Sequence, residues 1–249
     1  TVIYETLDSK AGEEYAEKYL KWQALAELDK PLIILIGGTT GVGKSTIATE
    51  IAHRLGITRI ANTDSIREVM RAFFSKELMP TLHCSSYDAW QSLRVPLPSS
   101  AHPVVVGFRE QALAVAVGVE AVIERAVREG TNMVLEGVHI VPGFIKAEYF
   151  KDAFVILMVI TVEDPEVHRS HFYIRAVESE GSRPFERYKI NFDNIRKIGE
   201  YVEGLARDQG IPVISSYNLD TTVTRVLDEI INRVMIPTDV EKREAKAAE

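Results

Sequence analysis

The sequence predicts an α/β fold in which helices cover both faces of a mostly parallel sheet. Short, β-branched apolar runs alternate along the chain with longer amphipathic segments. Glycines and prolines mark several of the junctions between them. Because strand–helix–strand connections within one sheet are right-handed, this alternation places the strands parallel and the helices on both faces.

Five short apolar runs are the expected strands. Most have the Val, Ile and Leu content of a strand that is buried on both faces. The others lie between two predicted helices, where the alternation of strands and helices calls for a strand. In chain order they are 32–36, 58–61, 133–135, 154–160 and 212–215. Numbered in that order, they are expected to lie in the sheet as 2-3-1-4-5.

Helices are expected where apolar residues recur at helical spacing. In chain order they are 12–28, 44–55, 65–74, 107–128, a segment starting at Asp164–Pro165, a segment from Phe185 to Ile198, and 221–235. Gly56 and Gly130 end two of them, and Pro165 suits a first helical turn. Segment 78–103 has four prolines and many serines, so we expect mostly loop there.

We divide the chain into three parts: a helical extension at 1–30, a main domain at 31–236 and a polar tail at 237–249. Within the main domain, residues of about 163–200 are expected to form a helical lid. A length of 249 residues with 46% hydrophobic content suits one large domain with a sizeable core.

Charge and cysteine content restrict the partners and the compartment. The net charge of −7 argues against extended contact with nucleic acid or an anionic membrane. The single cysteine, Cys84, excludes an intrachain disulfide and suits a reducing, cytoplasmic setting. The apolar run 31–38 is too short to span a bilayer, and we expect no signal peptide before it. A homodimer is left open.

Residues 38–45, Gly-Thr-Thr-Gly-Val-Gly-Lys-Ser, match the complete phosphate-binding pattern G-x-x-x-x-G-K-[ST], with a strand before it and a helix after it. Glycines let successive N–H groups point at phosphate oxygens, and the helix N-terminus adds positive charge. The pattern therefore predicts a P-loop NTPase fold with ATP and Mg²⁺ as cofactors. Lys44 is expected to reach the β- and γ-phosphates, and the Ser45 hydroxyl to ligate Mg²⁺. The expected nucleotide-binding residues are Gly38, Thr39, Thr40, Gly41, Val42, Gly43, Lys44, Ser45, Thr46 and, from the lid, Arg169.

Two carboxylates follow strands, where open parallel sheets bind ligands. Glu136 ends the third strand, where an acid helps to hold Mg²⁺, although a role as base or substrate contact and a solvated strand end stay open. Asp64 follows the second strand and could accept the proton of an acceptor hydroxyl. Its alternative role is a helix cap, because Ser65 and Glu68 have the spacing of a capping box.

Arginines are frequent after the fourth strand. Kinases cover the transferring group against water and stabilise its charge with lid arginines, so Arg175 and Arg183 are predicted to be catalytic. The competing interpretation is a pair of charged amphipathic helices. Earlier in the chain, Arg67 and Arg71 share a helix face that could bind an anionic acceptor or simply be solvated. Segment 217–222 could form a wall of the adenine pocket.

From about Pro31 to Ile231, the sequence resembles the archaeal 2-phosphoglycerate kinases. The segments that carry the resemblance are the phosphate loop with its strand, Thr63-Asp-Ser-Ile-Arg67, Ser85-Ser-Tyr-Asp-Ala-Trp90, Gly107-Phe-Arg-Glu-Gln111, Glu136-Gly-Val-His-Ile-Val-Pro-Gly143 and Arg183-Pro-Phe-Glu-Arg-Tyr188. The family often has an N-terminal region resembling an ATP-cone, which we expect here to be absent or reduced to a helix.

The resemblance implies transfer of a phosphoryl group from ATP to the C3 hydroxyl of 2-phosphoglycerate, giving 2,3-bisphosphoglycerate and ADP. A small phosphorylated acid needs several fixed positive donors. The expected substrate-binding residues are Asp64, Arg67, Ser85, Ser86, Tyr87, Arg109, His139 and Arg187, with Arg71 and Lys146 as further candidates. Two alternatives stay open. One is a kinase for a nucleoside, nucleotide or other small acceptor, and the other is an ATP-binding regulatory protein with little turnover.

Overall fold

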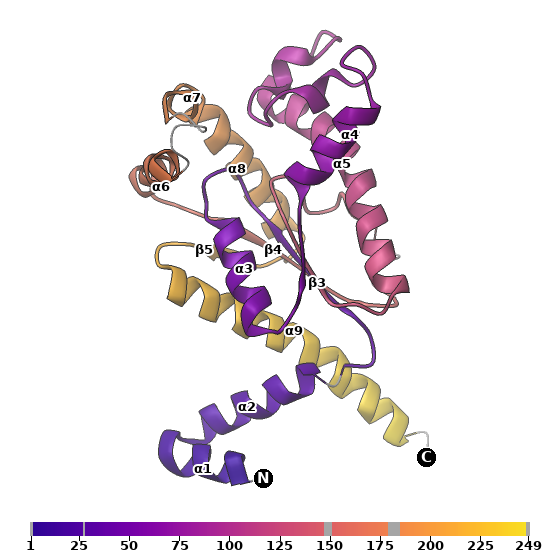
Figure 1. Cartoon of the computed structure of the whole chain (residues 1–249), viewed down its shortest axis with the longest axis vertical. Coiled ribbons are helices and arrows are strands. Elements are labelled where there is room, and N and C mark those ends of the chain that lie inside the picture. The colour runs from indigo at the N-terminus through magenta and orange to yellow at the C-terminus, as the bar shows by residue number, and fades with distance from the viewer. Residues whose placement is uncertain (1, 27, 147–150, 179–184, 248–249) are drawn as a thin grey trace.

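The computed structural model describes residues 2–26, 28–146, 151–178 and 185–247. Its centre is a sheet of five parallel strands in the order β2-β3-β1-β4-β5, which confirms the predicted class and order (Figure 1). The strands are β1 (Leu32–Gly37), β2 (Arg59–Asn62), β3 (Met133–Glu136), β4 (Phe154–Thr161) and β5 (Val213–Ser215).

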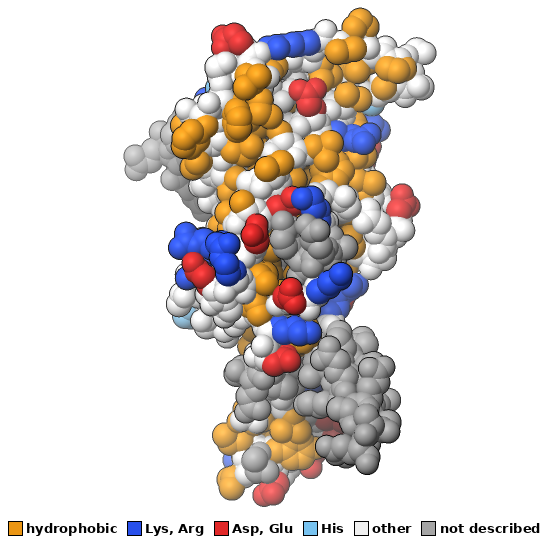
Figure 2. Space-filling model, turned by 90° about the vertical axis from the view of Figure 1, so that its right-hand side faces the viewer, with side chains coloured by type: hydrophobic (Ala, Val, Ile, Leu, Met, Phe, Trp, Pro, Cys, Tyr) orange, Lys and Arg blue, Asp and Glu red, His pale blue; other side chains and the backbone are white. Residues whose placement is uncertain are grey.

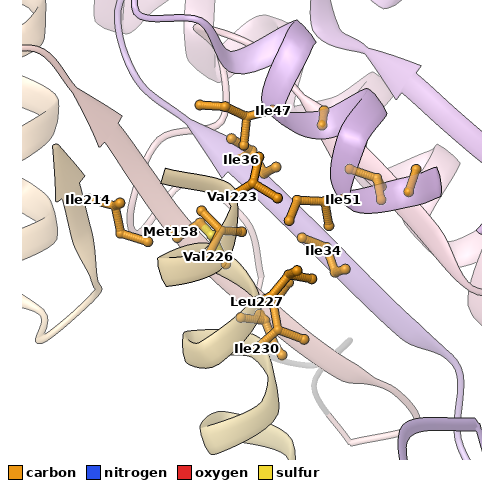
Figure 3. Packing of buried hydrophobic residues seen from close by; sticks show 14 of the residues in the cluster. Ile34, Ile36, Ile47, Ile51, Met158, Ile214, Val223, Val226, Leu227 and Ile230 are labelled. Atoms are coloured by element: carbon orange, nitrogen blue, oxygen red, sulfur yellow. The ribbon is translucent and has the colours of Figure 1, made fainter. Parts of the chain in front are cut away.

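Helices cover both faces of the sheet. On one face lie α3 (Lys44–Arg54) and α9 (Leu219–Ala247), and on the other lie α5 (Pro103–Arg128) and α8 (Phe192–Asp208). Strand β1 is buried at every position, and its alternate side chains enter opposite layers. Figure 3 shows the first layer, where Ile34 and Ile36 of β1 pack against α3 and α9.

The outer helices are α1 (Val2–Ala11), α2 (Glu13–Ala26), α4 (Thr63–Phe73), α6 (Pro165–Glu178) and α7 (Phe185–Ile190). Two short 3₁₀ turns, Pro80–His83 and Ala89–Ser92, lie within the segment that was predicted to be loop. The predicted extension corresponds to α1 and α2, and Trp22 and Leu28 at the end of this region pack against the α3–α9 layer.

The largest differences from the predictions concern three parts of the chain. Helix α1 was missed because no described side chain on it is buried, so it has no core-facing stripe to detect. The predicted helix through Phe185 and Ile198 is interrupted at Asn191, between α7 and α8. Helix α9 was expected to end at Met235 but continues to Ala247, through most of the predicted polar tail.

Helix α4 lies on α5 through only part of its apolar face. Ile66 and Met70 pack against the α5 layer, and a Cβ at Gly118 would lie 2.5 Å from Ile66 Cγ2. Val69 and Phe73 remain exposed, and Figure 2 shows apolar side chains spread over the upper half of this side of the molecule. The close packing of Ile66 fixes the start of α4, where Asp64 lies.

Among the described helices, none combines the length and the apolarity that a bilayer crossing requires.

The register of the sheet brings three strand ends together. Ile36 of β1 is opposite Glu136 of β3, which is itself opposite Asn62 of β2. The residues that follow these strands therefore emerge side by side at the carboxyl edge, where ligands of open parallel sheets bind.

Candidate active site

The phosphate loop between β1 and α3 depends on glycine at three positions. Gly38, Gly41 and Gly43 have φ values of +132°, +87° and +86°, which side chains rarely adopt. A Cβ at Gly38 would also lie 2.3 Å from the carbonyl oxygen of Ile160 on β4. The glycines thus permit both the curl of the loop and its close approach to the sheet.

Lys44 is buried at the start of α3, with its amine turned back over the loop. Its Nζ donates a hydrogen bond to the Thr39 carbonyl across 2.8 Å. Burial lowers the pKa of Lys44, and the negative charges of Glu136 and Asp64 oppose that shift. The amine therefore lies in the field of both carboxylates, in a position to balance the charge of a bound phosphate.

Ser45 and Glu136 meet across the gap between α3 and β3. The Ser45 hydroxyl donates to Glu136 Oε1 across 2.9 Å, and the Glu136 side chain is largely buried. A hydroxyl oxygen and a carboxylate oxygen beside a phosphate loop fit the oxygen ligands that Mg²⁺ prefers. The donor set thus suits a magnesium ion carried in with nucleotide phosphates.

A cavity of about 670 Å³ opens at this edge of the sheet. Its walls come from the phosphate loop, the ends of β2, β3 and β5, and α6. The lining residues are Thr40, Gly41, Gly43, Lys44, Ser45, Thr46, Ile47, Thr49, Ile60, Asn62, Asp64, Glu136, Gly137, Val138, His171, Ile174, Ser216, Tyr217 and Leu219. The structure thus brings most of the predicted phosphate-loop residues together with both predicted carboxylates. Tyr217 and Leu219 come from the segment that was expected to flank adenine.

Asp64 faces the cavity from the first turn of α4, and its side chain is 68% exposed. It does not cap the helix. The N-cap is Asn62, whose side-chain oxygen accepts a hydrogen bond from the Ser65 amide across 2.8 Å. The capping-box interpretation of Ser65 is therefore wrong, because the helix begins at Thr63, two residues before the predicted start at Ser65. The Asp64 carboxylate consequently has no capping role.

His139 is buried beneath the cavity rather than lining it. Its Nδ1 lies 2.8 Å from Thr63 Oγ1, and its Nε2 lies 3.0 Å from Gln111 Oε1. Gln111 donates its amide hydrogens to the Thr81 and Cys84 carbonyls, so its oxygen faces the histidine as an acceptor. His139 consequently donates from Nε2 and accepts the Thr63 hydroxyl hydrogen at Nδ1.

This arrangement keeps the His139 imidazole neutral. Burial lowers the pKa of His139 to about 3, with Asp64 opposing the shift and the Arg67 and Lys44 cations adding to it. A neutral ring with both nitrogens engaged is a structural link between β3, α4 and α5. In this conformation the ring does not reach the cavity.

Arg67 joins the same network from α4. Its guanidinium donates to the carbonyls of Leu82 and Cys84 across 3.0 and 2.9 Å, and its Nε lies 3.7 Å from Asp64 Oδ1. The Cys84 carbonyl thus receives hydrogen bonds from both Arg67 and Gln111. Arg67 therefore connects Asp64 to Cys84, the residue directly before Ser85.

The segment 85–90 lies against α7 and α8 rather than in the lining of the cavity. Ser86 and Tyr87 are buried, and Asn194 of α8 donates to the Tyr87 carbonyl across 3.3 Å. Arg187 of α7 donates to Ser85 Oγ across 3.0 Å and lies 3.6 Å from Asp88 Oδ2. Three predicted substrate-binding residues and Arg187 are therefore neighbours, in a patch next to the Arg67 network.

Helix α6 contacts the crest of the phosphate loop through two histidines that were not predicted from the sequence. His168 Nε2 donates to the Thr40 carbonyl across 2.8 Å, and His171 Nδ1 donates to the Gly41 carbonyl across 2.9 Å. Burial lowers the pKa of His168 to about 4. The spacing of these histidines, three residues apart on one helix face, was the available signal.

The predicted arginines lie in different environments. Arg169 pairs with Glu166 on its own helix, and its guanidinium lies 4.3 Å from the centre of the Phe192 ring. Arg109 is exposed on α5. Arg175 lies on α6, with its side chain outside the described set, and Arg183 lies outside the described residues altogether. None of these arginines is part of the described cavity lining.

Known proteins similar to this chain decide its family. It is 47% identical over 221 residues to the 2-phosphoglycerate kinase of Methanothermobacter thermautotrophicus. The aligned region covers 89% of this chain and 72% of that protein. The chain belongs to the 2-phosphoglycerate kinase family. The family members from Methanopyrus kandleri and Pyrococcus furiosus are each 42% identical to it, over 94% of this chain and 71% and 75% of their own lengths. Membership confirms the predicted resemblance and the predicted enzyme class.

No protein-family model matches the chain. Among solved structures, the shikimate kinase from Acinetobacter baumannii in complex with shikimate is 15% identical, with a TM-score of 0.49 over 85% of this chain and 97% of that one. The assignment to the family rests on the sequence relatives, and the fold on the strand order and the phosphate loop.

Proposed function

We propose that this kinase transfers the terminal phosphoryl group of ATP to the C3 hydroxyl of 2-phosphoglycerate. The observation that carries the proposal is the cavity in which the phosphate loop, Glu136 and Asp64 meet. The choice of 2-phosphoglycerate as the acceptor is supported by the family relatives, because each of those compared above is named a 2-phosphoglycerate kinase.

On the nucleotide side, the loop amides and Lys44 bind the phosphates of ATP. Ser45 and Glu136 hold Mg²⁺, which neutralises phosphate charge when it is bound. The side-chain oxygens of Ser45 and Glu136, 2.9 Å apart, are the groups that would hold the ion. The buried amine of Lys44 then offsets negative charge on the transferred group in surroundings of low dielectric constant.

On the acceptor side, Asp64 receives the hydroxyl proton as the oxygen attacks the γ-phosphorus. Its carboxylate is exposed to the cavity, and the Arg67 network holds the helix turn that carries it. The phosphate and carboxylate of the acceptor need cationic partners. Arg187, which donates to Ser85 Oγ, is a described candidate on the lid side.

The lid in this proposal consists of α6 and α7, which is shorter than the segment of about 163–200 predicted from the sequence. Helix α8 begins at Phe192, and its inward face, with Ile195 and Ile198, is buried in the core. A helix packed in this way belongs to the domain, so the lid is limited to α6 and α7, which cover the phosphate loop and can exclude water from the transferring group.

The test is ADP production from MgATP with 2-phosphoglycerate, 3-phosphoglycerate or glycerate as acceptor. We expect 2-phosphoglycerate to give the highest rate, and Lys44→Ala to lose roughly 100-fold or more of it. A higher rate with a nucleoside or another metabolite would show that this compound, and not 2-phosphoglycerate, is the acceptor. Tight ATP binding without acceptor-dependent ADP would instead favour a regulatory protein.

A further inference from the structure

A row of aromatic rings connects the phosphate loop to the segment that carries Ser85. Phe172 of α6 is 1% exposed and lies directly against Gly41, where an added Cβ would be 2.5 Å from its Cζ atom. Phe172 stacks on Tyr188 of α7, with centroids 4.7 Å apart and planes at 15°. Tyr188 in turn meets the buried Tyr87 edge-on, at 6.3 Å and 69°. We call Phe172, Tyr188 and Tyr87 the aromatic row.

Each end of the row is attached to one side of the site. Helix α6 is attached to the phosphate loop through the hydrogen bonds of His168 and His171 to two consecutive carbonyls. Helix α7 is attached to the acceptor side through Arg187, which contacts Ser85 and Asp88 and lies 5.9 Å from the centre of the Tyr87 ring. The Phe172–Tyr188 stack, made of one buried and one partly buried ring, is therefore the joint between these two attachments.

A stack of this kind has a strong geometric preference. Offset-stacked and edge-on rings are more favourable than other arrangements, and a buried pair adds to the free energy of its burial. If phosphate binding fixes the loop carbonyls, it also fixes α6, and the stack then favours one position of α7. Because coupling between two binding sites is reciprocal, an acceptor that fixes α7 must equally favour the loop conformation that binds nucleotide.

We infer that Phe172 and Tyr188 are positioning residues that make nucleotide binding and acceptor binding cooperative. The inference rests on the proposed function for the nature of the two ligands. It adds a link between the sites that neither the phosphate loop nor the acceptor residues provide by themselves. In this proposal, neither Phe172 nor Tyr188 touches the reacting atoms.

The first test follows the Ser85 segment without any acceptor. Amide hydrogen exchange of residues 85–92 is measured with and without a non-hydrolysable ATP analogue and Mg²⁺. We expect the analogue to slow exchange of this segment in the wild-type protein and in Tyr188→Phe, which keeps the ring. In Tyr188→Leu, which keeps apolar bulk but removes the stack, we expect the protection to disappear while the phosphate loop itself is still protected.

The matched control is Tyr173→Leu. Tyr173 also joins α6 to α7, through an edge-on contact with Phe185 at 6.1 Å, but it is 62% exposed, and its described ring contact is with Phe185 rather than with a member of the aromatic row. We expect this variant to keep the protection of residues 85–92. Equal loss of the protection in both Leu variants would assign the effect to general α6–α7 packing and overturn the role of the row. Full protection of residues 85–92 in Tyr188→Leu would overturn that role as well.

The second test measures the affinity for the ATP analogue without and with saturating 2-phosphoglycerate. We expect the wild-type affinity to increase roughly 5-fold with the acceptor present, within the usual range of coupling between sites, and the ratio to fall close to one in Tyr188→Leu. A wild-type ratio of one overturns the inference even if turnover of 2-phosphoglycerate is normal. Absence of turnover contradicts the proposed function instead, and the exchange experiment still decides the inference.

Discussion

The Ser45 hydroxyl and the Glu136 carboxylate are joined by a hydrogen bond of 2.9 Å that closes the gap between α3 and β3. Both groups are positioned by backbone. Ser45 lies in the first turn of the helix after the phosphate loop, and Glu136 is held in register between β1 and β2. This pair is the part of the site in which magnesium dependence can be tested most directly.

We predict that Ser45→Ala raises the Mg²⁺ concentration needed for half-maximal rate by about 10-fold. The variant removes one oxygen ligand, while Glu136 and the nucleotide phosphates remain. The measurement is initial rate against free Mg²⁺ at saturating ATP. Thr49→Ala is the matched control, because Thr49 also lines the cavity from α3 but donates its hydroxyl hydrogen to the Ser45 carbonyl. An unchanged Mg²⁺ requirement in Ser45→Ala would exclude this hydroxyl as a ligand.

Gly41→Ala is predicted to destabilise the protein and to weaken nucleotide binding. A side chain at φ +87° costs ~1–2 kcal/mol, and the collision with the Phe172 ring adds a further ~1–3 kcal/mol. Gly130→Ala is the control, because Gly130 has φ +60° but no atom within 4 Å of an added Cβ. Denaturant unfolding of both variants separates the two costs. Equal losses of stability would show that the Phe172 contact contributes nothing.

The stability of the protein is predicted to fall as the pH is lowered from about 6.5 towards 4. Burial lowers the pKa of His139 to about 3 and of His168 to about 4, from an ordinary value of 6.5. Over this range the unfolded chain takes up protons that the folded protein does not. The free energy of unfolding therefore decreases by at most ~1.4 kcal/mol per pH unit for each histidine.

His139→Gln should make that dependence on pH less steep. The measurement is urea unfolding at several pH values between 4 and 7.5. His53→Gln is the control, because His53 is exposed on α3 and should leave the slope unchanged. If His139→Gln and the wild-type protein lose stability equally over this range, the neutral, buried assignment of His139 is wrong.

Arg187→Gln is predicted to raise the KM for the acceptor by about 10-fold at saturating ATP, with little change in the affinity for ATP measured without acceptor. Arg187 lies beside Ser85 and Asp88, and a charge-assisted contact to an acceptor anion is stronger than a neutral one. Lys189→Gln removes an equal charge from the same short helix, at a side chain that pairs with Glu186. Steady-state kinetics give the KM for the acceptor, and a loss of ATP affinity in the absence of acceptor would instead reveal a nucleotide role.

Much of the fold and the nucleotide side of the site could be predicted from the sequence because local rules determine them. The phosphate loop needs glycine at particular backbone angles, and the strands of a sheet covered on both faces are continuous apolar runs. Glu136 and Asp64 were found because residues after parallel strands lie at one edge of the sheet. These features depend on neighbours in sequence or on the fold class alone.

The acceptor side could not be predicted in the same way, because long-range packing determines which donors are free. Arg67 has the spacing of an exposed anion-binding residue, yet its guanidinium is occupied by two carbonyls from a segment 15 and 17 residues away. His139 is similarly engaged by partners 76 and 28 residues distant. His168 and His171 have the spacing of one helix face, but their partners are loop carbonyls that only the fold brings within reach.

The tight junction at Gly137 has a consequence for how this enzyme could be altered. A Cβ at Gly137 would lie 1.9 Å from Thr63 Oγ1, so the chain leaving β3 is pressed against the chain entering α4. The backbone positions of Glu136 and Asp64, each next to one residue of this contact, are consequently held relative to each other. One added methyl group at Gly137 would displace the start of α4 and the Asp64 carboxylate with it, so a redesign of this enzyme for another alcohol has to keep this glycine.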